Sequence, residues 1–225
     1  MTIKPGAANK KPRPGRLRIV AGKWRSRLLD IAHEPGLRPT SERVRETLIN
    51  WLAPIVQGSR CLDLFAGTGA LGFEALSRGA RSVVFVENSR RAANALEKSA
   101  RVLDAAGAVV HCGDAAEYVR NARPASFDII FLDPPFTDDR LGELCAQLDA
   151  CGILAPGGRV YLEQDRAKPA TPLPDHWRVL KDKTAGNVRY MLVEVGACLL
   201  YTSDAADDRR GVYISVVAVS LKKNF

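Results

Sequence analysis

The 225-residue sequence contains no long run of apolar residues. No stretch reaches the roughly 18 residues that a membrane-spanning helix requires. The basic N-terminus, residues 1–18, has no apolar segment after its charges, so it does not resemble a secretory signal. Hydrophobic residues nevertheless make up 46% of the chain, which is enough for a buried core and excludes global disorder. We therefore expect a folded cytoplasmic protein without a membrane partner.

Cysteine is sparse and follows no recognisable spacing. The chain has five cysteines, and none forms the C-x-x-C pair of a zinc site. An odd, scattered set is not typical of a disulfide framework either. We expect small buried thiols in a reducing compartment and no metal site. The five are Cys61, Cys112, Cys145, Cys151 and Cys198.

Acidic residues are scarce in the first 50 positions, where four acids face twelve lysines and arginines. In the rest of the chain 21 basic residues balance 21 acidic ones, so the net charge of +8 lies in the N-terminal segment. A concentrated basic segment suits a polyphosphate such as RNA, because each phosphate contact releases counterions. The alternative is a solvated tail that keeps the protein soluble.

This basic segment divides into a tail and a small structured unit. Residues 1–15 lack apolar periodicity and should form a flexible tail. Within the unit 16–53, the stretches 17–20 and 25–29 predict a basic hairpin. The hairpin offers six candidates for RNA contact, although Trp24 could instead anchor it to the main domain. The six are Arg16, Arg18, Lys23, Trp24, Arg25 and Arg27.

A helix should complete the unit. It is expected to begin near Thr40 or Ser41, because hydroxyl side chains are favoured helix caps. Val44, Leu48 and Leu52 then recur on one face, which is the spacing of a helix that packs on a core.

From residue 54 to residue 196, apolar strands alternate with helical stretches. This alternation predicts an α/β domain whose parallel sheet carries helices on both faces. The pattern stops afterwards: residues 198–207 resemble a translated sequencing adapter, and we expect 197–225 to be an artefactual or unstructured tail. The expected strands are 61–64, 83–86, 108–111, 128–132, 160–163, 177–181 and 188–195, and the expected helices are 70–77, 91–103, 115–121 and 141–151.

A glycine-rich turn follows the first of these strands. The sequence Asp63-Leu-Phe-Ala-Gly67-Thr-Gly69-Ala-Leu-Gly72 matches G-x-G-x-x-G between a strand and a helix. Glycines there let the backbone turn tightly and approach a ligand. Glu87, at the end of the next strand, could accept hydrogen bonds from a ribose diol. These features predict a nucleoside site but do not separate NAD from S-adenosylmethionine.

Two further acids bear on which nucleoside binds. Asp63, beside the glycine turn, would repel a pyrophosphate but attract the sulfonium and ammonium groups of S-adenosylmethionine. It could also cap the turn. Asp114, after the third strand, could accept from an adenine amino group or cap the following helix. Asp63 therefore favours S-adenosylmethionine.

A second motif, Asp133-Pro134-Pro135-Phe136, ends the fourth strand, where open α/β sheets bind their ligands. The exocyclic amine of a purine is a poor nucleophile, because its lone pair is delocalised into the ring. The Asp133 carboxylate and the Pro134 carbonyl could hold both amino hydrogens and aim the lone pair at an electrophilic methyl. Phe136 could stack on an extruded base. The alternative is a rigid turn with Phe136 in the core.

These two motifs and two N-terminal segments carry a family resemblance. The segments are Arg18-Ile-Val-Ala-Gly-Lys-Trp-Arg25 and Leu37-Arg-Pro-Thr-Ser-Glu-Arg-Val-Arg-Glu-Thr-Leu48. Over roughly residues 16–195 the chain resembles the bacterial small-subunit ribosomal RNA guanine-N2 methyltransferases of the RsmD type. The N-terminal segments are the specific ones, since the other motifs occur in many amino-methyltransferases.

The resemblance implies a class I methyltransferase fold, a Rossmann-like, mostly parallel sheet of seven strands whose last strand is antiparallel. It implies methyl transfer from S-adenosylmethionine to the N2 amine of one guanine in 16S rRNA, within an assembling small subunit. We expect a monomer without a metal. For Arg43 and Arg45, a salt bridge and a phosphate contact are equal alternatives. The implied catalytic residues are Asp133, Pro134, Pro135 and Phe136, and the implied cofactor contacts are Arg38, Thr40, Asp63, Phe65, Gly67, Gly69, Glu87, Asn88 and Asp114.

Three other functions fit part of the sequence. An NAD(P)-dependent oxidoreductase would explain the glycine turn and Glu87 but not the Asp133 motif. A non-enzymatic RNA-binding assembly factor with a decayed methyltransferase fold conflicts with the intact Asp133 motif. A DNA adenine-N6 methyltransferase would share that motif, but the small size of the chain, without an added target-recognition domain, weighs against it.

Overall fold

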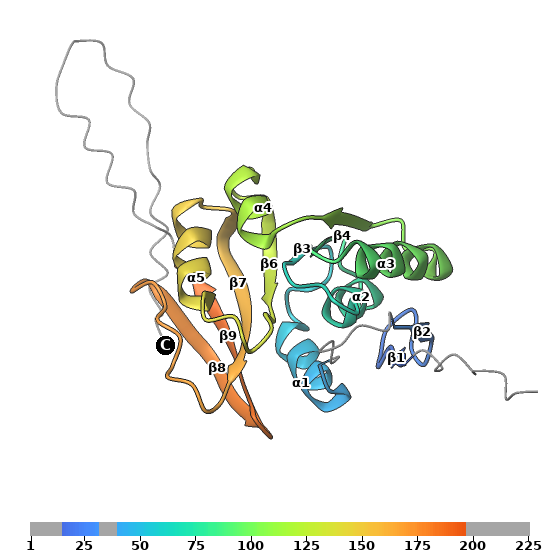
Figure 1. Cartoon of the computed structure of the whole chain (residues 1–225), viewed down its shortest axis with the longest axis horizontal. Coiled ribbons are helices and arrows are strands. Elements are labelled where there is room, and N and C mark those ends of the chain that lie inside the picture. Colours follow the sequence, from blue (N-terminus) through green and yellow to red (C-terminus); the bar gives the residue numbers. More distant parts are fainter. Residues whose placement is uncertain (1–14, 32–39, 197–225) are drawn as a thin grey trace, which may run out of the picture.

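The computed structural model describes residues 15–31 and 40–196. Residues 1–14 and 197–225 of the predicted tails, and Arg38, lie outside the described residues, as does Cys198. The described part forms a seven-stranded sheet with helices on both faces and a small two-stranded hairpin at one side (Figure 1). None of its helices is both long and apolar enough to cross a membrane.

The strand order β5-β4-β3-β6-β7-β9-β8 confirms the predicted mostly parallel α/β sheet. Each neighbouring pair from β5 to β7 is parallel, whereas β9 runs antiparallel to both β7 and β8. The direction in which successive strands are added to the sheet reverses at β3, because β4 lies on one side of it and β6 lies on the other. Such a switch point is where open sheets hold ligands. The strands are β3 (Arg60–Asp63), β4 (Ser82–Glu87), β5 (Ala108–Cys112), β6 (Phe127–Leu132), β7 (Leu154–Asp165), β8 (Trp177–Ala185) and β9 (Val188–Val195).

Two apolar clusters form the core, one on each face of the sheet. Alternate residues of a strand point to opposite faces, so Phe131 of β6 packs beneath α1, α2 and α3, while Ile130 and Leu132 pack beneath α4 and α5. This arrangement confirms the prediction of helices on both faces. The helices are α1 (Glu42–Leu52), α2 (Ala70–Ser77), α3 (Arg90–Leu103), α4 (Ala115–Asn121) and α5 (Leu141–Ala150).

The N-terminal hairpin is present, with shorter strands than expected. β1 (Arg16–Arg18) pairs with β2 (Leu28–Asp30), and the residues between them form turns that lie on α2. The backbone amide of Lys23 donates to the Ser77 carbonyl at 2.7 Å, and the Trp24 amide donates to the Ser77 hydroxyl at 3.0 Å. The Trp24 side chain is 8% exposed and belongs to the core. Trp24 therefore anchors the hairpin, which corrects its prediction as an RNA-stacking residue.

The helix after the hairpin begins as expected. Ser41 caps α1, and its hydroxyl accepts a hydrogen bond from the Val44 amide at 3.3 Å. Val44, Leu48 and Leu52 are buried, as their spacing predicted. The helix thereby holds Thr40, which directly precedes its cap, near the carboxyl end of β6.

The four described cysteines are free thiols. Cys61 and Cys145 are buried, and burial raises the pKa of each thiol to about 12. Cys112 and Cys151 are partly exposed, so the prediction of buried thiols holds for two of the four.

Candidate active site

The carboxyl ends of the central strands bring the predicted acids together. Asp63 ends β3, Glu87 ends β4 and Asp133 directly follows β6. β3 pairs with both β4 and β6, so the three acids lie at one edge of the sheet. Burial, reinforced by the charges of Asp133 and Glu87, raises the pKa of Asp63 to about 7. The motif of β6 is therefore beside the glycine turn of β3.

The glycine turn has the backbone conformation that its sequence predicted. Gly67 and Gly69 have φ angles of 50° and 76°, in the left-handed region that favours glycine. Glu87 accepts hydrogen bonds from the amides of Gly67 and Ser89, each at 2.8 Å. The acid of β4 thus holds the turn that follows β3, while its side chain remains partly exposed.

Asp63 has the turn-capping role that was one of its alternatives. Its side chain is almost fully buried and accepts a hydrogen bond from the Gly72 amide in α2 at 3.1 Å. Asp114 likewise caps α4, where it accepts from the Glu117 amide at 2.9 Å. Phe65 is half-buried near the turn, and Asn88 is exposed after β4. The contacts of these residues with a cofactor remain predictions.

The Asp133 motif forms an accessible turn. The hydroxyl of Thr40 donates to Oδ2 of Asp133 at 2.9 Å. Burial raises the pKa of Asp133 to about 6, and the hydrogen bond from Thr40 opposes that rise. Pro134 is buried, whereas Pro135 is exposed. Phe136 is 36% exposed, so its alternative as a core residue is wrong.

A second carboxyl, which the sequence reasoning did not single out, lies beside Asp133. Glu163 of β7 is 3% exposed, and the Tyr161 hydroxyl donates to its Oε1 at 2.7 Å. Burial and the charge of Asp133 raise the pKa of Glu163 to about 8. An acid near the carboxyl end of an otherwise apolar strand was the signal that could have identified it.

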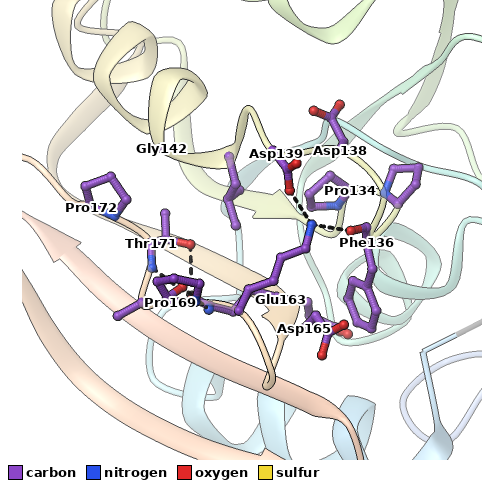
Figure 2. Close-up of a pocket in the computed structure, with 15 residues that line it drawn as sticks. Pro134, Phe136, Asp138, Asp139, Gly142, Glu163, Asp165, Pro169, Thr171 and Pro172 are labelled. Carbon is purple, nitrogen blue, oxygen red and sulfur yellow. Dashed lines mark hydrogen bonds and ion pairs between the residues drawn. The ribbon is translucent and has the colours of Figure 1, made fainter.

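Glu163 and the Asp133 motif border a cavity of about 180 Å³ (Figure 2). Pro134 and Phe136 lie on one side, and the loop that contains Pro169 and Pro172 lies on the other. Lys168 joins the two sides, because its ammonium group contacts the Phe136 carbonyl and the Asp139 carboxylate. The cavity therefore combines an aromatic ring, proline rings and a buried acid.

Buried charges connect this site to the hairpin. Arg45, 2% exposed, forms an ion pair with Glu74 at 2.5 Å. It also donates to the carbonyls of Arg18 and Thr40, at 2.9 and 3.1 Å. A phosphate contact by Arg45 is thereby excluded, and the salt-bridge alternative is confirmed. Arg43 is exposed, so both of its alternatives stay open.

The remaining hairpin candidates form an exposed basic surface. Arg16, Arg18, Lys23, Arg25 and Arg27 are all exposed. Three of them have contacts within the protein: Arg18 lies 4.0 Å from Glu42, Arg27 donates to the Val102 carbonyl at 3.1 Å, and the Lys23 ammonium lies 5.5 Å from the centre of the Trp24 ring. Across the described ranges, no group of three or more metal-ligating side chains is present.

Comparison with known proteins agrees with this geometry. The family model described as Conserved hypothetical protein 95 matches residues 17–194. The chain is 41% identical over 183 residues to ribosomal RNA small subunit methyltransferase D of Haemophilus influenzae, which covers 80% of this chain and 94% of that protein. The Escherichia coli K12 protein of the same name is 40% identical over 180 residues, with 80% and 90% covered. The solved structure of yhhF from Escherichia coli superimposes with a TM-score of 0.76 and 37% identity, and it covers 81% of this chain and 99% of that one. The chain therefore belongs to the ribosomal RNA small subunit methyltransferase D family and has its class I methyltransferase fold.

Proposed function

We propose that this protein transfers a methyl group from S-adenosylmethionine to the exocyclic N2 amine of one guanine in 16S rRNA. The family resemblance implies guanine 966 as the target. The observation that carries the proposal is the Asp133 motif, which follows β6 directly beside the glycine turn of β3. As the relatives' name indicates a small-subunit RNA, we further propose that the protein acts in the cytoplasm on an assembling small subunit.

The residues around the glycine turn suit S-adenosylmethionine. Glu87 and Asp114 are partly accessible carboxylates at the ends of β4 and β5, where they can accept from a ribose diol and an adenine amino group. When bound, S-adenosylmethionine supplies an electrophilic methyl on a positively charged sulfur. The acids Asp63, Glu87 and Asp133 create a negative field that favours a cation at this edge of the sheet. The same field disfavours the pyrophosphate of NAD.

Asp133 and Pro134 would activate the amine. Thr40 occupies Oδ2 of Asp133, so Oδ1 can accept one amino hydrogen while the Pro134 carbonyl accepts the other. Holding both hydrogens tilts the nitrogen toward tetrahedral geometry and aims its lone pair. The methylated nitrogen must then lose a proton, which the Asp133 carboxylate would take. Phe136 would stack on the base, an interaction worth about 1–3 kcal/mol.

The exposed arginines of the hairpin would bind the phosphates that flank the target. They lie on an element that Arg45 links to Thr40, and Thr40 contacts Asp133. Binding of RNA by the hairpin would therefore place the base near the reacting carboxylate. Such contacts position the RNA and carry no sequence information themselves.

Methyl incorporation from labelled S-adenosylmethionine tests the proposal. Naked 16S rRNA, immature small subunits and duplex DNA are incubated separately with the protein, and the products are digested to nucleosides. We expect N2-methylguanosine from the ribosomal substrates and no incorporation into duplex DNA. N6-methyladenine as the product would overturn the substrate assignment, and absence of incorporation into every substrate would overturn the proposed activity.

A further inference from the structure

Glu163 is a buried acid that the mechanism above does not use. It lies on β7, the strand that pairs with β6, and borders the cavity beside Phe136. Its exposed fraction of 3% means that its carboxyl was removed from water at a substantial cost. Beside a reacting carboxylate, such a carboxyl can accept a hydrogen from a bound base through the lone pairs that its own partners leave free.

The other acids that border the cavity already have hydrogen-bond donors or cations within the protein as partners. Asp138 forms an ion pair with Arg140 at 2.9 Å, and Asp139 contacts Lys168. Asp165 accepts from the amide of Ala167 at 2.9 Å, which ties it to its own turn. Glu163 differs, because its partners are neutral hydroxyls: Tyr161, which donates to its Oε1, and Thr40. Among these acids, Glu163 is the one best suited to receive a donor from a bound base.

The carboxyls of Asp133 and Glu163 have similar hydrogen-bond partners. Each carboxyl accepts from a hydroxyl, Thr40 for Asp133 and Tyr161 for Glu163, and the Thr40 hydroxyl also contacts Glu163. The two carboxyls lie close enough for the charge of Asp133 to raise the pKa of Glu163. Two neighbouring carboxylates without a cation would repel each other in a buried site. A ligand with two neighbouring hydrogen-bond donors would relieve that repulsion.

The edge of guanine supplies that pair of donors. Its N2 amine lies next to N1–H, whereas the N6 amine of adenine lies next to N1, which is an acceptor. We propose that Glu163 accepts the N1–H of the target base while Asp133 holds its amine, so that Glu163 selects guanine over other aminopurines. This inference rests on the proposed function, and it assigns a specificity-determining residue to the same site. The donor also favours the ionised form of Glu163, which offsets the cost of its burial.

An RNA with 2-aminopurine in place of the target guanine tests this contact. 2-Aminopurine keeps the amine that would be methylated, but its N1 is an acceptor and it lacks O6. At a pH above about 8, where the carboxyl of Glu163 is ionised, we expect wild-type protein to methylate the guanine RNA with a kcat/KM at least about tenfold higher than that for the 2-aminopurine RNA. The carboxylate would face a second acceptor at N1 of 2-aminopurine. In Glu163→Gln the side-chain amide can donate to N1 of 2-aminopurine, so this preference should fall by about tenfold.

Two further variants separate the contact from other effects. Loss of O6 affects wild type and variants equally, so the change in preference reports on N1. Glu163→Leu should also lose the preference, and if it does not fold, the result for Glu163→Gln decides. Asp165→Asn, which alters a neighbouring acid of the same cavity, should keep the wild-type preference.

The outcomes separate this inference from the proposed function. If wild type methylates guanine but shows no preference over 2-aminopurine, the inference is wrong and the proposed function stands. An unchanged preference in Glu163→Gln, or a shift in Asp165→Asn instead, also overturns it. If wild type methylates neither RNA, the proposed function itself fails.

Discussion

The two halves of the site hold their carboxylates in different ways. On the side of the glycine turn, Asp63, Glu87 and Asp114 each accept a backbone amide, from Gly72, Gly67 and Glu117 respectively. On the side of β6 and β7, Asp133 and Glu163 are held by side-chain hydroxyls.

Because their hydrogen-bond donors differ, the two halves of the site should respond differently to mutation. Backbone amides remain in place whatever side chains surround them, so the geometry of the glycine-turn side follows from a local motif. Side-chain hydroxyls can be removed by a single substitution, and Thr40 is 93 positions from Asp133. We therefore expect changes on the glycine-turn side to alter cofactor affinity, and changes on the β6–β7 side to alter the rate and pH dependence of methyl transfer.

Removal of the reacting carboxylate should have the largest effect. In Asp133→Ala the amine loses its principal acceptor, and we expect kcat to fall by roughly 10²- to 10³-fold. Affinity for S-adenosylhomocysteine, measured by calorimetry, should stay close to that of wild type. A parallel loss of this affinity would show that the two sides are not separable.

Glu87→Gln should show the opposite pattern to Asp133→Ala, with its effect on cofactor affinity and not on the rate. The charged acceptor of the turn is lost, and a hydrogen bond to a charged group is worth about 1.5–3 kcal/mol. We expect affinity for S-adenosylmethionine to fall about tenfold or more, with little change in kcat at saturating cofactor. Glu97→Gln, on the exposed surface of α3, is the matched control. Equal effects of the two variants would contradict the role of Glu87.

Thr40→Val should lower kcat by about tenfold, because Asp133 loses the donor that orients it. Since the Thr40 hydrogen bond lowers the pKa of Asp133, its removal should raise that pKa above about 6. The reactive form is ionised, so activity is lost as pH falls through this pKa, and in the variant the loss should begin at a higher pH. The pH profile of kcat measures this shift, and Thr40→Ser should restore the wild-type profile. A profile that does not move would assign Thr40 a structural role alone.

A single hairpin arginine should have the smallest effect. Arg25→Gln should weaken RNA binding a few-fold across sequences and reduce the slope of log affinity against log salt by about 1. Filter binding at several salt concentrations measures both. Arg120→Gln, on the exposed surface of α4, is the control. A greater loss of RNA affinity in Arg120→Gln than in Arg25→Gln would indicate that RNA binds near α4 and not at the hairpin.

The sequence predicted the glycine-turn side well, because local patterns specify it. Helices 70–77 and 115–121 have the predicted bounds, and Gly67 and Gly69 adopt the predicted backbone conformation. Each of these features depends on residues close together in the chain.

The β6–β7 side could not be predicted as fully, because it depends on contacts between distant segments. Thr40 was expected at the cofactor, but the hydrogen bond of its hydroxyl to Asp133 was not predicted. Strand β7 was expected at 160–163 but begins at Leu154, since Gly157 and Gly158 interrupt the apolar pattern while Leu154 still pairs with Phe127. Within the predicted strand Glu163 was a single acid, and its role depends on its neighbours across the sheet.

A structure of the protein with S-adenosylhomocysteine tests the central claim most directly. We expect the ribose hydroxyls on Glu87 and the sulfur facing the carboxylate of Asp133 across the mouth of the glycine turn. If the sulfur instead lies away from Asp133, with the β6 motif out of its reach, the carboxylate cannot hold the amine against the methyl, and the proposed mechanism is contradicted.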